Sequence, residues 1–127
     1  MIFTLQANQI EDFWHRIEPL LLRVKDPGWT PEDVKQTLIN AHAQLWGMGD
    51  FDAIWITKIE RTGQTLWALL WITAGTGLEE GLELFHTYTE PWLKSLGCEF
   101  VQIIGRKGWK RALPDYEERG IVLVKEL

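Results

Sequence analysis

Four cations surround one tryptophan late in the chain. Arg106, Lys107, Lys110 and Arg111 flank Trp109. Cations beside an aromatic ring can bind phosphate and stack on a base, and Trp and Arg also anchor protein interfaces. The third interpretation is a solvated helix face with Trp109 in the core. The pattern leaves all three open, and these five side chains are our predicted partner-binding residues.

The other reactive side chains form no recognisable constellation. The three histidines, His15, His42 and His86, are scattered and lack the Cys/His spacing of a metal site, so we expect no metal. Glu60, His42 and His86 are candidate general bases, but none has a partner at a suggestive spacing. The one cysteine, Cys98, follows a glycine at the start of an expected strand, and we expect it to be a small buried hydrophobe.

The composition is that of one globular domain. The chain has 127 residues, of which 46% are hydrophobic and 24% charged, and this excludes disordered, collagen-like and coiled-coil chains. A net charge of −5 argues against a dedicated nucleic-acid binder. The apolar run 66–72 is too short to span a membrane, and residues 1–12 lack the basic start and apolar centre of a signal peptide. We therefore expect no membrane partner.

Hydrophobic periodicity and turn signals predict a mixed α/β order. Thr30 and Pro31 mark a helix start, and Pro19 predicts a kink or break near residues 15–18. The strand at 65–73 is apolar on both faces, which is typical of a central strand covered by helices. The expected elements are a strand at 1–6, a helix through residue 24, a helix at 31–39, an antiparallel meander of strands at 44–48, 53–60 and 65–73, a helix at 78–96, a strand at 99–104 parallel to 65–73, a helical or turn-rich segment at 105–115 and a final strand at 120–127.

This order resembles the GNAT superfamily of acyl-CoA-dependent N-acyltransferases over nearly the whole chain. Tyr116-Glu117-Glu118-Arg119-Gly120-Ile121 is similar to the family's Tyr-x-x-x-Gly-Phe/Ile step into a late strand. The segments 44–46, 105–116 and 122–127 resemble small GNAT-like proteins of tailed phages and gene-transfer elements. The resemblance implies a single GNAT-like α/β (α+β) domain over 1–127, with a central mixed six- to seven-stranded sheet flanked by about four helices in the order β-α-α-β-β-β-α-β-α-β.

The resemblance also implies where acetyl-CoA would bind. Family members hold the pyrophosphate on backbone N–H groups at the start of the helix after the central strand, where the helix dipole favours an anion. The coenzyme-binding residues implied here are Trp71, Thr73, Gly77, Leu78, Gly81 and Leu82. Tyr116 matches the family's proton donor to the departing thiolate; the other interpretation is a packed tyrosine whose hydroxyl bonds to backbone or water.

The expected coenzyme loop departs from the family pattern. Gly77 and Gly81 are out of register with Gln/Arg-x-x-Gly-x-Gly/Ala, and Glu79 and Glu80 stand at the helix start. Two like charges ~4 Å apart at an effective dielectric of ~20 cost about 4 kcal/mol, roughly a thousandfold in affinity.

We therefore expect a catalytically degenerate GNAT-like module that needs no cofactor. The phage resemblance implies a structural or binding role in virion assembly or as a virion component, with other phage proteins as partners, in the host cytoplasm and the virion. A homo-oligomer is left open. The alternatives are an active acetyl-CoA-dependent N-acetyltransferase, with Tyr116 as the acid, and a nucleic-acid or phosphate contact through residues 105–111.

Overall fold

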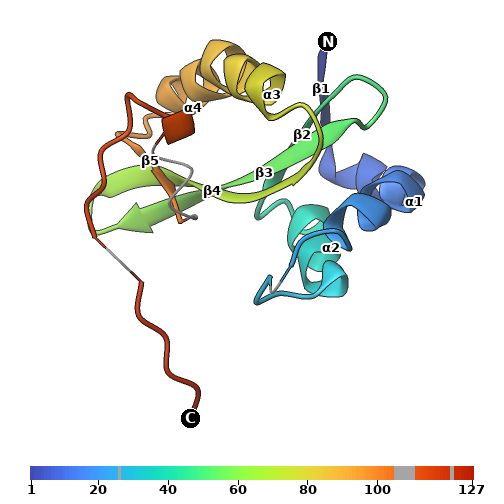
Figure 1. Ribbon diagram of the computed structural model, residues 1–127, viewed down its shortest axis with the longest axis horizontal. Coiled ribbons are helices and arrows are strands. Elements are labelled where there is room, and N and C mark those ends of the chain that lie inside the picture. Colours follow the sequence, from blue (N-terminus) through green and yellow to red (C-terminus); the bar gives the residue numbers. More distant parts are fainter. Residues whose placement is uncertain (26, 105–110, 121) are drawn as a thin grey trace.

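Five strands form one mixed sheet whose spatial order follows the sequence (Figure 1). The computed structural model describes residues 1–25, 27–104, 111–120 and 122–127. The first four strands pair antiparallel and the fifth lies parallel to the fourth. The strands are β1 (Ile2–Leu5), β2 (Gln44–Met48), β3 (Ala53–Thr62), β4 (Thr65–Gly75) and β5 (Val101–Ile103). The expected meander and the parallel return strand are both present.

Helices cover both faces of this sheet because β3 and β4 are apolar on both sides. On β3, Ile54 and Ile56 belong to one core cluster, whereas Trp55, between them, belongs to the other. This is the alternation that a pleated strand imposes. The first cluster lies under α1 (Ile10–Leu21) and α2 (Pro31–Ile39). The second lies on the other face, under the helical run from α3 (Leu78–Leu84) to α4 (Glu90–Ser95).

Local sequence signals fix the start of α2. The Thr30 hydroxyl accepts a hydrogen bond from the Asp33 N–H at 3.1 Å, and the Asp33 carboxylate accepts one from the Thr30 N–H at 3.2 Å. This reciprocal box, with Pro31 in the first turn, confirms the expected helix start. Of the kink or break expected from Pro19, the break was wrong, because α1 runs through Pro19 and ends only at Leu21; the kink stays a prediction.

The third expected helix is interrupted by a π-helical turn. Residues Phe85–Thr89 lie between α3 and α4, and the Glu90 N–H donates to the carbonyl of Phe85, five residues back. Pro91 follows at once. Proline has no N–H to give to the carbonyl four residues earlier, so the regular pattern could not continue there in any case. The irregularity takes the form of a π-helical turn just before Pro91.

The strand count is lower than expected. The part of the chain that the structure describes forms five strands instead of six to seven, and β5 is shorter than the expected 99–104. The strand expected at 120–127 was wrong: residues 120 and 122–127 form no ladder and are exposed. Strand propensity records which residues fit a sheet, but a strand also needs a neighbouring edge.

A helical or turn-rich segment is expected at 105–115, and residues 105–110 of it lie outside the residues that the structure describes. Just beyond them, Leu113 is 2% exposed and anchors this late segment in the core. No helix in the described residues is long and apolar enough to cross a bilayer.

Candidate functional site

The sheet opens at a bulge in β4. Ile56 pairs with Ile72 and Thr57 with Leu70, so Trp71 is an extra residue on β4. The parallel ladder to β5 ends at the same place, with Leu70 opposite Ile103. A bulge bends and twists its strand, so β4 and β5 part here. Beyond the bulge, residues 71–75 keep β3 on one side and have no strand of the described chain on the other.

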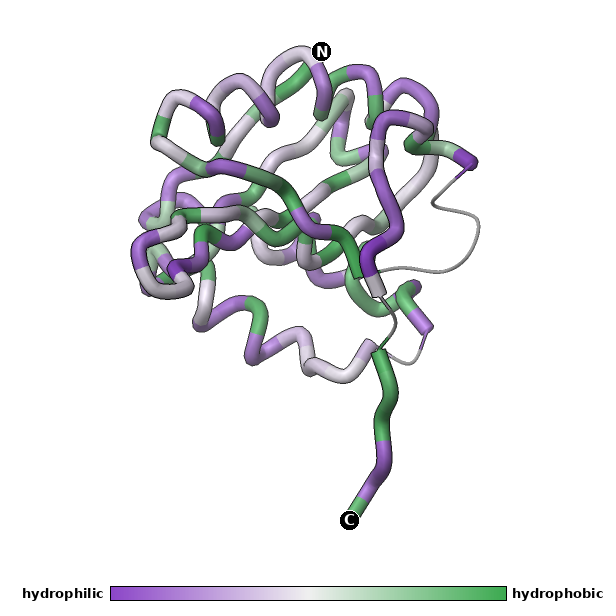
Figure 2. The backbone as a smooth tube through the Cα atoms, turned by 90° about the vertical axis from the view of Figure 1, so that its left-hand side faces the viewer, coloured by the Kyte–Doolittle hydropathy of each residue, from purple (hydrophilic) through white to green (hydrophobic). Residues whose placement is uncertain are grey.

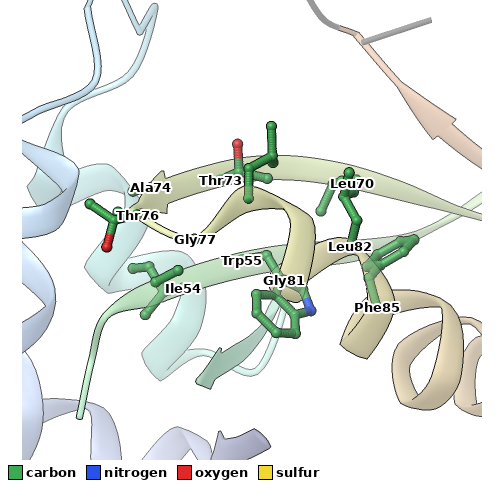
Figure 3. Close-up of a pocket in the computed structure, with 13 residues that line it drawn as sticks. Ile54, Trp55, Leu70, Thr73, Ala74, Thr76, Gly77, Gly81, Leu82 and Phe85 are labelled. Atoms are coloured by element: carbon green, nitrogen blue, oxygen red, sulfur yellow. The ribbon is translucent and has the colours of Figure 1, made fainter. Parts of the chain in front are cut away.

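A small apolar cavity lies beside this opening, under α3 (Figure 3). Its volume is about 100 Å³. The indole of Trp55 forms one wall, with Gly81 and Phe85 beside it. Five of the six coenzyme-binding residues implied by the family resemblance line the cavity: Thr73, Gly77, Leu78, Gly81 and Leu82.

The sixth residue, Trp71, faces a larger hollow of about 570 Å³ towards the connection between α1 and α2. Arg23 and Lys25 line it from that connection. The ammonium of Lys58 lies 3.7 Å from the centroid of the Trp71 ring, a cation–π contact. The cavity and the hollow share four residues of β4, namely Leu70, Thr73, Ala74 and Gly75. The open edge of β4 therefore borders both spaces.

Tyr116 is held by a carboxylate on the helix above the sheet. Its hydroxyl donates to Oε2 of Glu90 at 2.5 Å, and Nδ1 of His86 lies 3.0 Å from Oε1 of the same carboxylate. Burial raises the pKa of Tyr116, and the hydrogen bond and negative charge of Glu90 raise it further. A raised pKa keeps the phenol protonated at neutral pH. None of these three side chains lines the cavity or the hollow.

The sequence did not lead us to predict Glu90 as the partner of Tyr116 and His86. The spacing from His86 to Glu90, four residues on one helix, was a readable signal. Nothing local connects Glu90 with Tyr116, because they are 26 positions apart. The other candidate bases are less suggestively placed: Glu60 is half-buried on β3 opposite Trp67, and His42 is exposed. Among the described residues, no three His, Cys, Asp or Glu side chains form a metal cluster.

The two glutamates at the start of α3 point to solvent. Glu79 and Glu80 are exposed, and neither lines the cavity. In bulk water, two unit charges 4 Å apart repel by only about 1 kcal/mol, instead of the 4 kcal/mol assumed for a partly desolvated site. The two glutamates therefore repel a pyrophosphate at this helix start far less than expected. Of the predicted partner-binding residues, Arg106, Lys107, Trp109 and Lys110 lie outside the described residues, and Arg111 is exposed.

The sequence matches no protein-family model and no curated protein, but the fold matches solved acetyltransferases. An aminoglycoside acetyltransferase from an uncultured soil metagenomic sample, in complex with trehalose, superposes with a TM-score of 0.72 at 16% identity, over 100% of this chain and 95% of that one. Its complex with sisomicin gives a TM-score of 0.70. A GNAT family acetyltransferase from Staphylococcus aureus gives 0.67 at 13% identity, over 100% and 98% of the two chains. The chain has the GNAT acetyltransferase fold.

Proposed function

We propose that this protein is an N-acyltransferase that uses acetyl-CoA as the acyl donor. The observation that carries the proposal is the parting of β4 from β5 at the Trp71 bulge, with a cavity and a hollow that meet along the freed edge of β4. The GNAT acetyltransferase fold supports an enzyme better than a purely structural module.

The freed edge suits an extended donor that carries amide groups. On the side of residues 71–75 away from β3, the backbone N–H and C=O groups that point outward meet no neighbouring strand of the described chain. An extended arm such as that of CoA can hydrogen-bond to such an edge as an added strand would. The apolar walls under α3 suit its methylene groups, and Gly75 and Gly77 at the cavity rim bring backbone without a side chain close to the ligand.

In this arrangement the acceptor amine approaches through the hollow beside Trp71. Its nitrogen attacks the thioester carbonyl carbon, the C–S bond breaks, and the departing thiolate takes a proton. The amine must lose a proton to attack, and no described carboxylate or histidine lines either space. In this proposal, solvent water in the open hollow takes that proton.

Tyr116 stays a predicted proton donor. Its hydroxyl is committed to Glu90, and a phenol with a raised pKa is a weak acid towards a thiolate of ordinary pKa about 8.5. Tyr116 could serve only after its hydroxyl turns from Glu90 to the sulfur. The Tyr116→Phe variant addresses this: if Tyr116 is the donor, thiol release falls by about 10²-fold or more while acetyl-CoA binding is unchanged.

Calorimetric titration with acetyl-CoA tests the site itself. Gly81→Leu places a side chain in the cavity beside Trp55, whereas Glu83→Leu adds the same side chain on the exposed face of the same helix. We expect binding in the unaltered protein and in Glu83→Leu, and its loss in Gly81→Leu. Absence of binding in the unaltered protein, or equal binding in both variants, would contradict the proposed site.

One observation favours a second candidate, a GNAT-like binding module without catalysis: the only tyrosine suited to the acid role is bonded to a carboxylate away from the cavity. Thiol release from acetyl-CoA with a panel of amines separates the two, because the module binds without turnover. The proposed virion role and the proposed contact of residues 105–111 with a protein or nucleic acid have no support in the fold. They are tested by co-purification of partners with the full chain.

A further inference from the structure

The hollow beside Trp71 is bordered by positive charge. Arg23 and Lys25 line it from the connection between α1 and α2. A third cation, Lys58, does not line the hollow, but its ammonium lies 3.7 Å from the centroid of the Trp71 ring, which does. Within the described chain no Asp or Glu lines the hollow, and none of the three cations forms an ion pair. The described residues therefore leave this positive charge without a negative partner.

Charge of this sign selects among amine acceptors. A diamine would bring a second ammonium beside Arg23 and Lys25, and like charges repel. An anionic group is attracted instead, and the guanidinium fork of an arginine matches the paired oxygens of a carboxylate or a phosphate. A nearby positive charge also favours the neutral form of an amine, which is the form that attacks a thioester. The hollow therefore suits an acceptor with an amine at one end and an oxyanion at the other.

We propose that the acceptor is a primary amine that also carries a carboxylate or a phosphate, and that Arg23 and Lys25 bind this acidic group. The proposal rests on the N-acyltransferase function proposed above. The neutral amine nitrogen bonds to the acetyl carbon, the C–S bond breaks, and the proton that the nitrogen loses passes through water to the departing sulfur. Residues 122–127 line neither space, and Figure 1 and Figure 2 show that they lead away from the body, so they leave the hollow open to such an acceptor.

A matched series of acceptors tests the charge preference. β-Alanine, δ-aminovalerate and ε-aminocaproate are each compared with their own uncharged amides, cadaverine supplies a cationic acceptor, and phosphoethanolamine against ethanolamine separates a phosphate from a carboxylate. Thiol release from acetyl-CoA gives kcat/KM for each amine. Exposed charge contacts contribute up to about fivefold each, so two contacts should favour the best acid over its uncharged partner by about tenfold. Added salt should lower this ratio, because it screens exposed charges.

Two double variants locate the contact. Arg23→Gln/Lys25→Gln removes the two proposed ligands of the acidic group, whereas Arg61→Gln/Lys94→Gln removes the same charge from exposed positions that line neither space. We expect the ratio of acid to amide to fall to about one in the first variant and to stay unchanged in the second, with unchanged acetyl-CoA binding by calorimetry in both. Weaker acetyl-CoA binding in the first variant, with acid and amide affected equally, would overturn the proposal and assign the two cations to the coenzyme phosphates.

The same measurements separate this proposal from the proposed function. Equal rates with acids, amides and cadaverine would overturn the acidic acceptor and leave the acyltransferase intact. If no amine is acetylated, the proposed function fails, and calorimetric titration of the acids into the protein decides the anion site alone. Binding of an acid but not of its amide, lost in Arg23→Gln/Lys25→Gln, would then support the site, and no binding of any acid would overturn it.

Discussion

Replacing Gly81 by alanine should stabilise the folded protein, although Gly81 lines the cavity. Gly81 lies inside α3, and a Cβ there would meet nothing closer than Cζ3 of Trp55 at 3.9 Å, an ordinary van der Waals distance. Glycine inside a helix costs about 0.5–1 kcal/mol relative to alanine. Since nothing needs to move, the free energy of unfolding should rise by about that amount.

The same change at Gly77, one turn earlier, should have the opposite sign. Gly77 has φ of +79°, and its added Cβ would lie 2.6 Å from Cε of Met48. An L-residue in the left-handed region costs roughly 1–2 kcal/mol, and the end of Met48 must also shift. We therefore expect a loss of about 1–2 kcal/mol. Gly63→Ala separates the two causes, because Gly63 has φ of +62° with nothing within 4 Å of a Cβ.

Urea unfolding at 25 °C, followed by tryptophan fluorescence, measures all three variants. We expect the Gly81→Ala and Gly77→Ala values to differ by about 1.5–3 kcal/mol, with unchanged denaturant slopes. Gly63→Ala should lie between the unaltered protein and Gly77→Ala. A destabilised Gly81→Ala would show that the space beside Trp55 is already filled, and a neutral Gly77→Ala would show that the turn into α3 is not left-handed.

Three further predictions concern the site. Tyr116→Phe should lower the free energy of unfolding by about 1–2 kcal/mol at pH 7, because the hydrogen bond to Glu90 is lost. Since folding raises the pKa of Tyr116, the stabilisation that Tyr116 provides is fully present below pH ~10 and is lost progressively as the pH rises above it. Urea titrations at alkaline pH should therefore show a smaller difference between the two proteins, and a difference that stays constant would contradict this. Glu79→Gln/Glu80→Gln should tighten acetyl-CoA binding by calorimetry about fivefold, since exposed charges contribute about 1 kcal/mol; a thousandfold gain would restore the repulsion argument. Gly75→Ala should lower stability by about 2–4 kcal/mol in thermal unfolding, because its Cβ would meet a backbone oxygen at less than contact distance; a neutral variant would contradict the close approach.

The sequence predicted best those features whose causes are local. The Thr30 cap needs only Asp33 three residues later, and the meander needs only short turns between apolar runs. The bulge at Trp71 was not predicted, because it depends on how β4 registers with β3. The strand at 120–127 was predicted wrongly for a related reason: its pattern fits a sheet, but pairing depends on an edge that no local pattern reveals.

The candidate site mixes both kinds of information. The family resemblance implied that Gly77 and Gly81 would bind the coenzyme, and both glycines line the cavity. The link between Tyr116 and Glu90 joins positions far apart in the sequence, so it follows from the packing of the late segment against α4. Spacing alone could find the His86–Glu90 pair but not its third member.

The wall of the cavity is fixed by the core. Trp55 is 4% exposed, and its indole N–H donates to the hydroxyl of Thr89, itself fully buried, at 3.0 Å. Thr89 ends the π-helical turn, and single π-helical turns inside α-helices often occur at functional sites. An indole N–H left unpaired at this depth would cost about 1–3 kcal/mol, so the bond holds the helix at one height above β3. A ligand entering beside β4 therefore meets a preformed wall, and little of its binding energy is needed to order the protein.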